Sequence, residues 1–408
     1  MLLLVLVLVW VAEGQWHRKW EIASSNGYVL LLSLFFIWHV VGLTYTKDIS
    51  SGLFELEKKI SLLLFPLILG TATIQRRGIT IKVIWSFVTA CLIAATVCLV
   101  GGFYRFRKGI PPGGSVYGGH DATLEFRKAH TQISAIWDYI TYTELTVPIK
   151  IHPTYFSIYV LFCLIFLFYT LRKSYQSYGQ LDWQKIGLVL LLLCFSCFLF
   201  LLSSRIAIVL YALCLVSMPV VIFYKRLNKV RLVALIFVLI LLTTILVAQI
   251  PVIKHRFLSD LEMFTKGFET GNPGTGMYQR LYIWQSSVTL IEINPLTGAG
   301  TGDAQLALNE EYARKCLELA GLNAHNQFLQ TAIMLGIPAM LLLIALFVVP
   351  FILAVRNRDI IYAYFLLIFF VANLTEAMLQ RHKGIVFYAL LNTLLFFYKY
   401  DSKTKELK

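Results

Sequence analysis

The sequence predicts an all-α polytopic integral membrane protein, folded as a single transmembrane domain over residues 1–408. Hydrophobic residues make up 58% of the chain, charged residues make up 14%, and the mean hydropathy is +0.72. A soluble domain carries about 25% charged residues, so this chain has too few charges to cover a water-exposed surface. Apolar runs of about 20 residues recur along the chain, and such runs cross a bilayer as helices that satisfy their own backbone hydrogen bonds.

Ten runs are long and apolar enough to be spanning helices. A further apolar stretch at residues 1–12 is too short to cross, and it lacks the basic start and the cleavage site of a signal peptide. We expect it to be the end of a span whose beginning precedes this start site, which makes about 11–12 transmembrane helices. The ten runs cover residues 28–46, 59–74, 81–102, 153–171, 185–203, 206–224, 231–250, 326–354, 360–375 and 384–399.

The distribution of charge predicts the orientation of these helices. One alternating set of connections, which includes the clusters Arg76-Arg77 and Arg172-Lys173, holds 18 Lys and Arg against 6 Asp and Glu. Short cytoplasmic loops of membrane proteins collect Lys and Arg, so this set is predicted to face the cytoplasm. The two long connections, 103–152 and 251–325, then form a first and a large periplasmic loop.

The two long loops differ in character. Residues 110–119, IPPGGSVYGG, make the first loop irregular. The second loop shows helix-like spacing of apolar residues at 277–293 and 303–321, separated by the turn-rich segment NPLTGAGTG. Loops of this length are usually functional, so the large loop is expected to carry part of an active site.

The basic excess and the cysteines have ordinary explanations in a membrane protein. The net charge of +14 reflects cytoplasmic loops, so nucleic acid is not predicted as a partner. Six of the seven cysteines lie within apolar runs, and Cys316 alone lies outside them. No disulfide framework is indicated, and Cys194 and Cys197 are interpreted as packing residues rather than a metal or redox pair.

Two arginines are candidates for anion binding. Arg205 interrupts LLSSRIAIVL between two spans, at the predicted outer end of a tight hairpin. An ionisable group at this depth either extends to the lipid headgroups or serves a function, such as anion binding on rigid helices. Arg280 opens RLYIW in the large outer loop, where a lone arginine is otherwise an ordinary surface residue.

His325 and Asn326 stand where the large loop re-enters the membrane, at the expected N-terminal end of a spanning helix. Free backbone N–H groups and the positive helix end make this position attractive to anions. A neutral imidazole here could take a proton beside a bound anion, and nearby arginines would lower its pKa and keep it neutral. Pro338, inside the same run, is predicted to kink the helix.

Other polar residues are weaker candidates. His152 begins a span at its outer end, and Glu376, Arg381 and His382 fill a short outer connection. Each of these residues is either a substrate contact or an anchor at the membrane interface. His39, inside an apolar run, is interpreted as a hydrogen-bonded core histidine. We predict no metal site and no cofactor, because the chain contains no metal-ligand motif such as H-E-x-x-H and no P-loop.

Arg205 stands before the large loop, and a series of further residues follows it: Arg280, Trp284, Pro295, Gly298, Gly300, Gly302, His325, Asn326 and Gly336. With this pattern the sequence resembles a known family, the O-antigen ligase and O-antigen polymerase superfamily of bacterial envelope membranes. The ligase signature is His, then Asn, Ser or Gln, nine residues, Gly, two residues, and Gly, Thr or Tyr. The chain follows it to Gly336 and departs at Ala339. The similarity covers roughly residues 185–400 well, whereas residues 1–150 match mainly in hydropathy and span count.

The resemblance implies a GT-C-like membrane glycosyltransferase that is metal-independent and inverting. Such enzymes move a glycan from an undecaprenyl-diphosphate-linked donor to a sugar hydroxyl at the periplasmic face of the bacterial inner membrane. The acceptor is lipid A–core in a ligase and another repeat unit in a polymerase of O-antigen or exopolysaccharide. His325, Arg280 and Arg205 are then the expected catalytic residues, with substrate contacts expected from Asn326, Trp284, Arg381, Glu376 and His152.

Alternative functions remain at this stage. The favoured interpretation is a ligase, and the polymerase is the main alternative because both use the same loop and arginines. A transporter of lipid-linked glycan would place charges near the middle of the membrane, whereas the candidate charges lie at the outer ends of spans. A non-catalytic scaffold that binds the acceptor would not need His325.

Overall fold

The computed structural model describes residues 2–72, 76–108, 136–177, 182–223 and 277–405, together with scattered residues between 228 and 245. All of the regular secondary structure in the described residues is helical, and no strand occurs among them. The chain divides into two compact units, residues Met1–Val83 with Met263–Lys408 and residues Ile84–Glu262. The predicted all-α class is confirmed.

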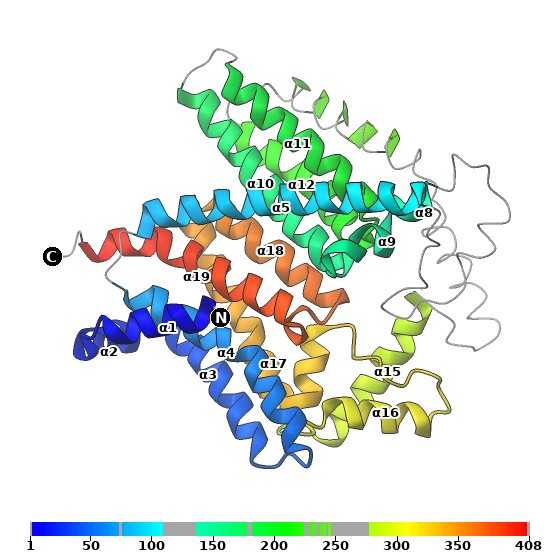
Figure 1. Ribbon diagram of the computed structural model, residues 1–408. Coiled ribbons are helices and arrows are strands. Elements are labelled where there is room, and N and C mark those ends of the chain that lie inside the picture. The colour runs from blue at the N-terminus through cyan, green and yellow to red at the C-terminus, as the bar shows by residue number, and fades with distance from the viewer. Residues whose placement is uncertain are drawn as a thin grey trace. The chain divides into compact units, whose positions relative to one another are not determined.

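The first unit combines both ends of the chain. Its helices are α1 (Leu2–Ala12), α2 (Trp16–Ser25), α3 (Gly27–Leu43), α4 (Ile49–Thr71), the start of α5 (Arg76–Arg107), α15 (Met277–Ile293), α16 (Ala304–Arg314), α17 (Gln327–Arg356), α18 (Ile360–Thr375), the short η2 (Met378–Gln380) and α19 (His382–Lys405). Figure 1 shows α3 and α4 beside α17, and α4 packs closely against α19. Segments about 300 residues apart in sequence therefore form one core.

The second unit centres on α10 (Pro153–Ser177), which packs against α11 (Trp183–Leu201) and α12 (Arg205–Phe223). The rest of α5 and three short helices, α8 (Trp137–Ile140), α9 (Tyr142–Thr146) and η1 (Val147–Ile149), complete its described part. The large side chains of α10 between Tyr155 and Leu167 are buried. An ion pair joins α5 to α9, with 2.6 Å between Arg105 Nη1 and Glu144 Oε2.

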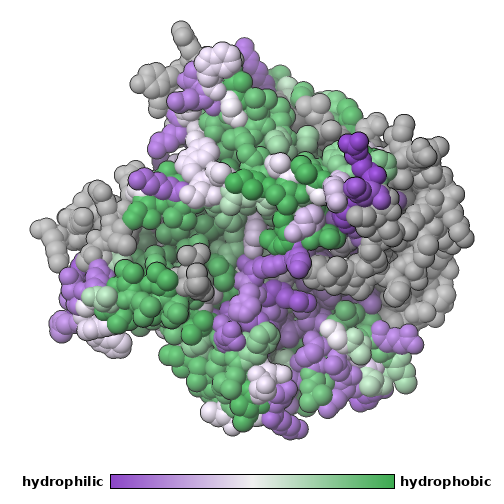
Figure 2. Space-filling view, in the orientation of Figure 1, coloured by the Kyte–Doolittle hydropathy of each residue, from purple (hydrophilic) through white to green (hydrophobic). Residues whose placement is uncertain are grey.

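Several helices have the length and composition of membrane spans. Among the described residues, Gly78–Arg107, Pro153–Ser174, Trp183–Leu201 and Gln327–Arg356 qualify, and α2 and α3 form a fifth candidate that is bent by 91°. Large apolar side chains are exposed along α5 and α11, and Figure 2 shows apolar residues over much of the visible surface of the helices. Exposed apolar surface of this extent suits lipid contact, so the protein is a multi-pass membrane protein.

Most of the predicted apolar runs coincide with helices. The predicted helix at 277–293 is α15, residue for residue, whereas α16 ends at Arg314 rather than at 321. The run at 59–74 is the second part of a longer helix, because α4 begins at Ile49 and includes charged residues. The run at 231–250 and the segments 109–135 and 251–276 lie largely or wholly outside the described residues.

Helix α17 is broken at Gly336, which has φ 81° and ψ 173°. We expected a kink at Pro338, but the break lies two residues earlier. The two features act together, because Pro338 has no N–H to donate to the carbonyl of Met334 and the Ile337 N–H donates instead to Pro295 O at 2.7 Å. A Cβ on residue 336 would lie 2.2 Å from Leu296 O, so only glycine fits.

The glycine-rich segment that follows α15 fills this break. The N–H groups of Ala299 and Gly300 donate to the carbonyls of Ile333 and Met334, at 2.8 and 2.9 Å, which the break leaves without their helical partners. The same segment is fixed to the turn between α3 and α4, where the Asp303 carboxylate accepts the N–H groups of Lys47 and Asp48. The segment thus sets where α15 and the start of α17 stand relative to each other.

Candidate active site

Two predicted site residues, Arg280 and His325, lie beside the carboxylate of a third, Glu376. Its Oε2 lies 3.4 Å from His325 Nδ1 and 3.9 Å from Arg280 Nη2. Arg280 lies in the first turn of α15, His325 directly precedes α17, and Glu376 directly follows α18. The side chains of Arg280, His325 and Glu376 are 34%, 27% and 14% exposed, so the group is open to a ligand on one side.

The backbone holds His325 in an uncommon conformation. Its φ is 42°, a left-handed value that non-glycine residues adopt mainly where the surroundings enforce it. Its N–H donates to Asn323 Oδ1 at 3.0 Å. The next residue, Asn326, caps α17 through Oδ1, which accepts the N–H groups of Phe328 and Leu329. The cap that Asn326 forms therefore fixes the position of His325 at the start of α17.

Trp284 and Gln330 support the segment that carries His325. Trp284 Nε1 donates to the carbonyl of Ala324 at 3.1 Å, and Gln330 Oε1 accepts the N–H of the same residue at 2.9 Å. Trp284 stands one turn after Arg280 on α15, so one helix supplies the arginine and supports the histidine. The structure places Trp284 as a support for the loop.

Glu376 occupies the C-terminal end of α18, where its N–H still donates to Ala372 O. A carboxylate at a helix C-terminus meets the negative end of the helix dipole, so Glu376 depends on nearby cations or donors. Gln327 holds the chain after it, because Gln327 Oε1 accepts the N–H of Leu379 at 2.8 Å and its side chain is buried. Among the described residues, Arg280 and His325 are partners of the Glu376 carboxylate.

The Nδ1 contact favours one tautomer of His325. When Nδ1 carries the proton and donates it to Glu376, Nε2 has a free lone pair and can accept a proton from a substrate. The arrangement resembles that of catalytic histidines in other proteins, in which a carboxylate orients the ring. The cluster can therefore combine a proton acceptor with an arginine for anion binding.

Two predicted site residues belong to the second unit. Arg205 is the first residue of α12 and is partly buried, directly after the buried Ser203 and Ser204, and Ser203 has a φ of 49°. His152 precedes α10, where its Nδ1 accepts the N–H of Thr154 at 3.3 Å and its ring contacts Tyr142 and Tyr155. His152 thus acts as a helix cap in the structure.

Arg381 and His39 complete the predicted set. Arg381 is exposed between η2 and α19. His39 is 1% exposed and its Nδ1 donates to Phe35 O at 2.8 Å, which confirms the interpretation as a core histidine. Within the described ranges, no group of three or more His, Cys, Asp or Glu side chains could hold a metal ion.

Sequence reasoning missed a charged group on α4. Glu55 pairs with both Lys58 and Lys59, and the two lysines are buried. Lys58 Nζ also donates to the carbonyl of Gln380 at 3.3 Å. The available signal was the segment FELEKK at residues 54–59, whose last lysine begins the predicted apolar run.

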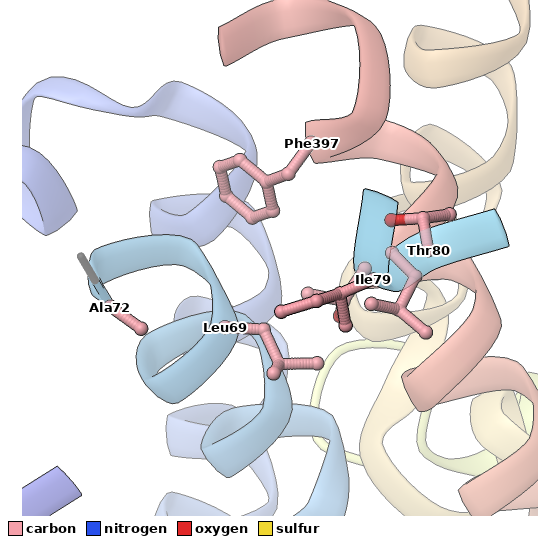
Figure 3. A pocket seen from close by; sticks show the side chains of 7 residues that line it. Leu69, Ala72, Ile79, Thr80 and Phe397 are labelled. Carbon is pink, nitrogen blue, oxygen red and sulfur yellow. The ribbon is translucent and has the colours of Figure 1, made fainter. Parts of the chain in front are cut away.

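A small apolar pocket lies elsewhere in the first unit. Figure 3 shows Leu69 of α4, Ala72 directly after it, Ile79 and Thr80 of α5, and Phe397 of α19 around it, and Thr393 and Leu394 also line it. These described lining residues carry no charge. None of them belongs to the Glu376 cluster.

A family model matches the middle of the chain. Residues 189–344 match the family model described as O-antigen ligase. The matched segment begins within α11, ends within α17, and contains Arg205, Arg280 and His325. No curated protein was found to match the chain. Over residues 189–344, the chain is therefore similar to the O-antigen ligase family.

Proposed function

We propose that the protein is an O-antigen ligase-type glycosyltransferase of the bacterial cytoplasmic membrane. It moves a glycan from undecaprenyl diphosphate to a sugar hydroxyl of lipid A–core at the periplasmic face. The family match supports a glycosyltransferase of the ligase and polymerase type. The single structural observation that carries the proposal is the contact of Glu376 with both His325 and Arg280.

In the proposed reaction, the acceptor hydroxyl attacks the anomeric carbon of the donor sugar. His325 Nε2 takes the hydroxyl proton as the new C–O bond forms, while Glu376 accepts the Nδ1–H and orients the ring. The bond from the anomeric carbon to the phosphate oxygen breaks, and its electron pair stays on the departing undecaprenyl diphosphate. Attack opposite the leaving group inverts the anomeric configuration. General base catalysis of this kind contributes roughly 10²–10⁴ in rate.

Arg280 supplies charge stabilisation for the leaving diphosphate. Its 3.9 Å distance to Glu376 is longer than a hydrogen bond, and its side chain is 34% exposed. A guanidinium binds phosphate through two parallel N–H donors, so an incoming diphosphate can displace the weak contact with Glu376. A well-placed donor of this kind is worth about 3–4 kcal/mol in the transition state. Positive charge from arginine makes a metal ion unnecessary in this mechanism.

The other predicted contacts keep their roles as proposals. Arg205 would bind a phosphate group, and Asn326, Trp284 and His152 would contact the glycans directly or through the segments that they support. Arg280→Lys tests the diphosphate role most specifically, because it keeps the charge but loses the two-donor geometry. Transfer should fall about 10²-fold or more while the protein inserts normally, and wild-type transfer in that variant would rule the role out.

Mass analysis of lipid A–core from cells with and without the gene tests the proposed reaction. Loss of the gene should leave lipid A–core without attached polymer while carrier-linked polymer accumulates. A ligase is contradicted if long carrier-linked polymer itself disappears, which is the result expected of a polymerase. Ala339, where the ligase signature has Gly, Thr or Tyr, is the observation that keeps the polymerase as the second candidate.

A reconstituted assay distinguishes a glycosyltransferase from a transporter and from a scaffold. A purified enzyme should join the two lipid substrates without any gradient, whereas a transporter would form no new glycosidic bond. A scaffold would allow transfer to continue after His325→Ala, because binding of the acceptor does not need a proton acceptor.

A further inference from the structure

Basic side chains gather at the N-terminus of α19, away from the catalytic group. Arg381 directly precedes the helix, and its carbonyl accepts the N–H of Ile385. His382 and Lys383 follow in the first turn. The N-terminal end of a helix carries partial positive charge, so cations are unfavourable there and anions are favoured. The sequence places three basic residues at this unfavourable position.

Helix α4 adds a buried cation to the same place. Lys58 is 9% exposed and its Nζ donates to the carbonyl of Gln380 at 3.3 Å. Phe54, one turn earlier on the same face of α4, contacts the ring of His382 with 6.4 Å between ring centroids. One face of α4 therefore borders the segment 380–382 directly.

Among the described residues, the carboxylates near Lys58 and Arg381 leave positive charge in excess. Glu55 is shared between Lys58 and Lys59, so it neutralises one of the two. Glu57 lies on the exposed side of α4, and the carboxylate of Glu376 is already in contact with His325 and Arg280. Arg381 has no carboxylate partner among the described residues. Partial loss of hydration and the charge of Arg381 together lower the pKa of Lys383.

Two donors beside these cations also lack partners. Gln380 is 8% exposed, and its Nε2 has no hydrogen-bond partner in the described structure. The Oγ of Ser61, one turn after Lys58 on α4, is buried and likewise without a partner. A buried donor without an acceptor is costly. A bound anion would supply acceptors to these donors and offset the excess positive charge.

We propose that Lys58, Gln380, Arg381 and Lys383 form an anion site that binds a phosphate group of the lipid acceptor. This inference rests on the proposed function, and it assigns to the acceptor a site separate from the donor diphosphate at Arg280. Arg381 is five positions after Glu376, and an extended chain of that length spans at most about 18 Å. A phosphorylated glycolipid bound at α19 can therefore present a sugar hydroxyl to His325 from a few sugar units away.

The segment between the two sites is held at both ends. Gln327 binds the N–H of Leu379, and Lys58 binds the carbonyl of Gln380. Gln327 lies two residues after His325, so the histidine and the anion site are linked through one short, fixed connection. The arrangement suits a substrate that must be positioned at two points.

The test compares one glycolipid acceptor with and without its phosphate groups, using purified protein in a neutral detergent. The double variant Arg381→Gln with Lys383→Gln should raise the KM for the phosphorylated acceptor at least tenfold. A factor of ten in KM corresponds to the loss of a single favourable contact. The kcat and the KM for the donor should stay within about twofold of the wild-type values, because the proposed site is separate from the donor diphosphate at Arg280. For the dephosphorylated acceptor, wild type and variant should have the same raised KM. Arg18→Gln, which removes an exposed charge on α2, is the control.

Three results would overturn the proposal. A rise in the KM for the donor instead would assign the cluster to the donor diphosphate. Inhibition of wild type by excess phosphatidylglycerol, at the concentration of acceptor itself, would make it a general lipid headgroup contact. Equal KM values for both forms of the acceptor would show that its phosphate is not bound.

A binding measurement separates this proposal from the proposed function. Equilibrium binding of the phosphorylated and dephosphorylated acceptors to wild-type protein needs no turnover. If the protein prefers the phosphorylated acceptor but transfers no glycan, the anion site stands and the proposed reaction fails. If glycan is transferred with no such preference, the reaction stands and the anion site fails.

Discussion

Among single residues, Glu376 provides the most specific test of the mechanism. Its carboxylate contacts His325 Nδ1 and lies near Arg280. Glu376→Gln keeps the shape but loses the charge, so kcat should fall roughly 10–100-fold, as for other residues that orient a functional histidine. The KM for the donor should not rise, because Arg280 is left free for the diphosphate. Steady-state kinetics with purified protein measure both values.

The control for this variant is Glu292→Gln, which removes an exposed carboxylate from the other end of α15. It should leave both kinetic values unchanged. A Glu376→Gln enzyme with wild-type kcat, or one that has lost kcat only because its melting temperature has fallen, would remove the orienting role.

Among the helices, α17 depends most on one residue. Gly336 has a left-handed φ of 81°, and a Cβ there would lie 2.2 Å from Leu296 O. Gly336→Ala should therefore destabilise the protein by about 1–3 kcal/mol or more, because the break in α17 and the glycine-rich segment that fills it must both shift. The melting temperature in detergent should fall clearly, with loss of transfer.

Gly187→Ala is the matched control for this substitution. Gly187 lies in α11, and a Cβ there would meet no atom within 4 Å. Its melting temperature should stay the same or rise slightly, because alanine favours the helix over the unfolded chain. Equal melting temperatures for Gly336→Ala and wild type would contradict the account of the break.

Helix α16 should show a pH-dependent contribution to stability. Glu311 is 4% exposed, it accepts two hydrogen bonds of 2.8 Å from Arg314, and it pairs with Lys315. These partners lower the pKa of the Glu311 carboxyl. Because the folded pKa is the lower one, the stabilisation is present above the ordinary pKa of about 4.3 and is lost as the pH falls through the folded value.

Melting temperatures of wild type and Glu311→Gln between pH 7 and pH 3 test this sign. The difference between the two proteins should be largest near neutral pH and should shrink below about pH 4.3. Glu310→Gln, which changes the exposed neighbouring carboxylate, should show little difference at any pH. A gap that widens as the pH falls would reverse the assignment.

Across the entire chain, the predicted orientation can be tested with a native cysteine. Cys316 is exposed between α16 and α17, whereas the other six cysteines lie in apolar helices. A charged, membrane-impermeant maleimide should label intact spheroplasts of wild-type cells but not those of Cys316→Ser. Labelling that appears only after the membrane is opened would place the large loop in the cytoplasm and contradict the positive-inside assignment.

Much of the fold could be predicted from the sequence because apolar runs of spanning length become helices in a membrane protein. α15 and α18 were predicted to the residue, and α17 within two residues at each end. α4 was not, because Glu55 pairs with Lys58 and Lys59 inside the helix, and a composition rule treats such charges as an end. These ion pairs depend on the geometry of the helix, and amino-acid composition carries no information about that geometry.

The site residues were predicted one at a time, but their relations were not. His325 and Glu376 are 51 residues apart in sequence, and only the packing of α17 against α18 brings them together. His152 was predicted as a substrate contact or an interface anchor, and the bond from the Thr154 N–H to its ring, which caps α10, could not be read from the sequence. The glycine-rich segment looked like a plain loop, and its role became visible only with the break in α17 that it fills.

The most direct test of the central claim is glycan transfer by the purified protein. Wild-type protein in detergent, with an undecaprenyl-diphosphate-linked glycan, lipid A–core and a metal chelator, should yield lipid A–core that is heavier by the mass of the glycan. His325→Ala, folded to the same melting temperature, should yield at least about 10²-fold less product. Undiminished transfer by His325→Ala, or no product from wild type, would contradict the proposed reaction.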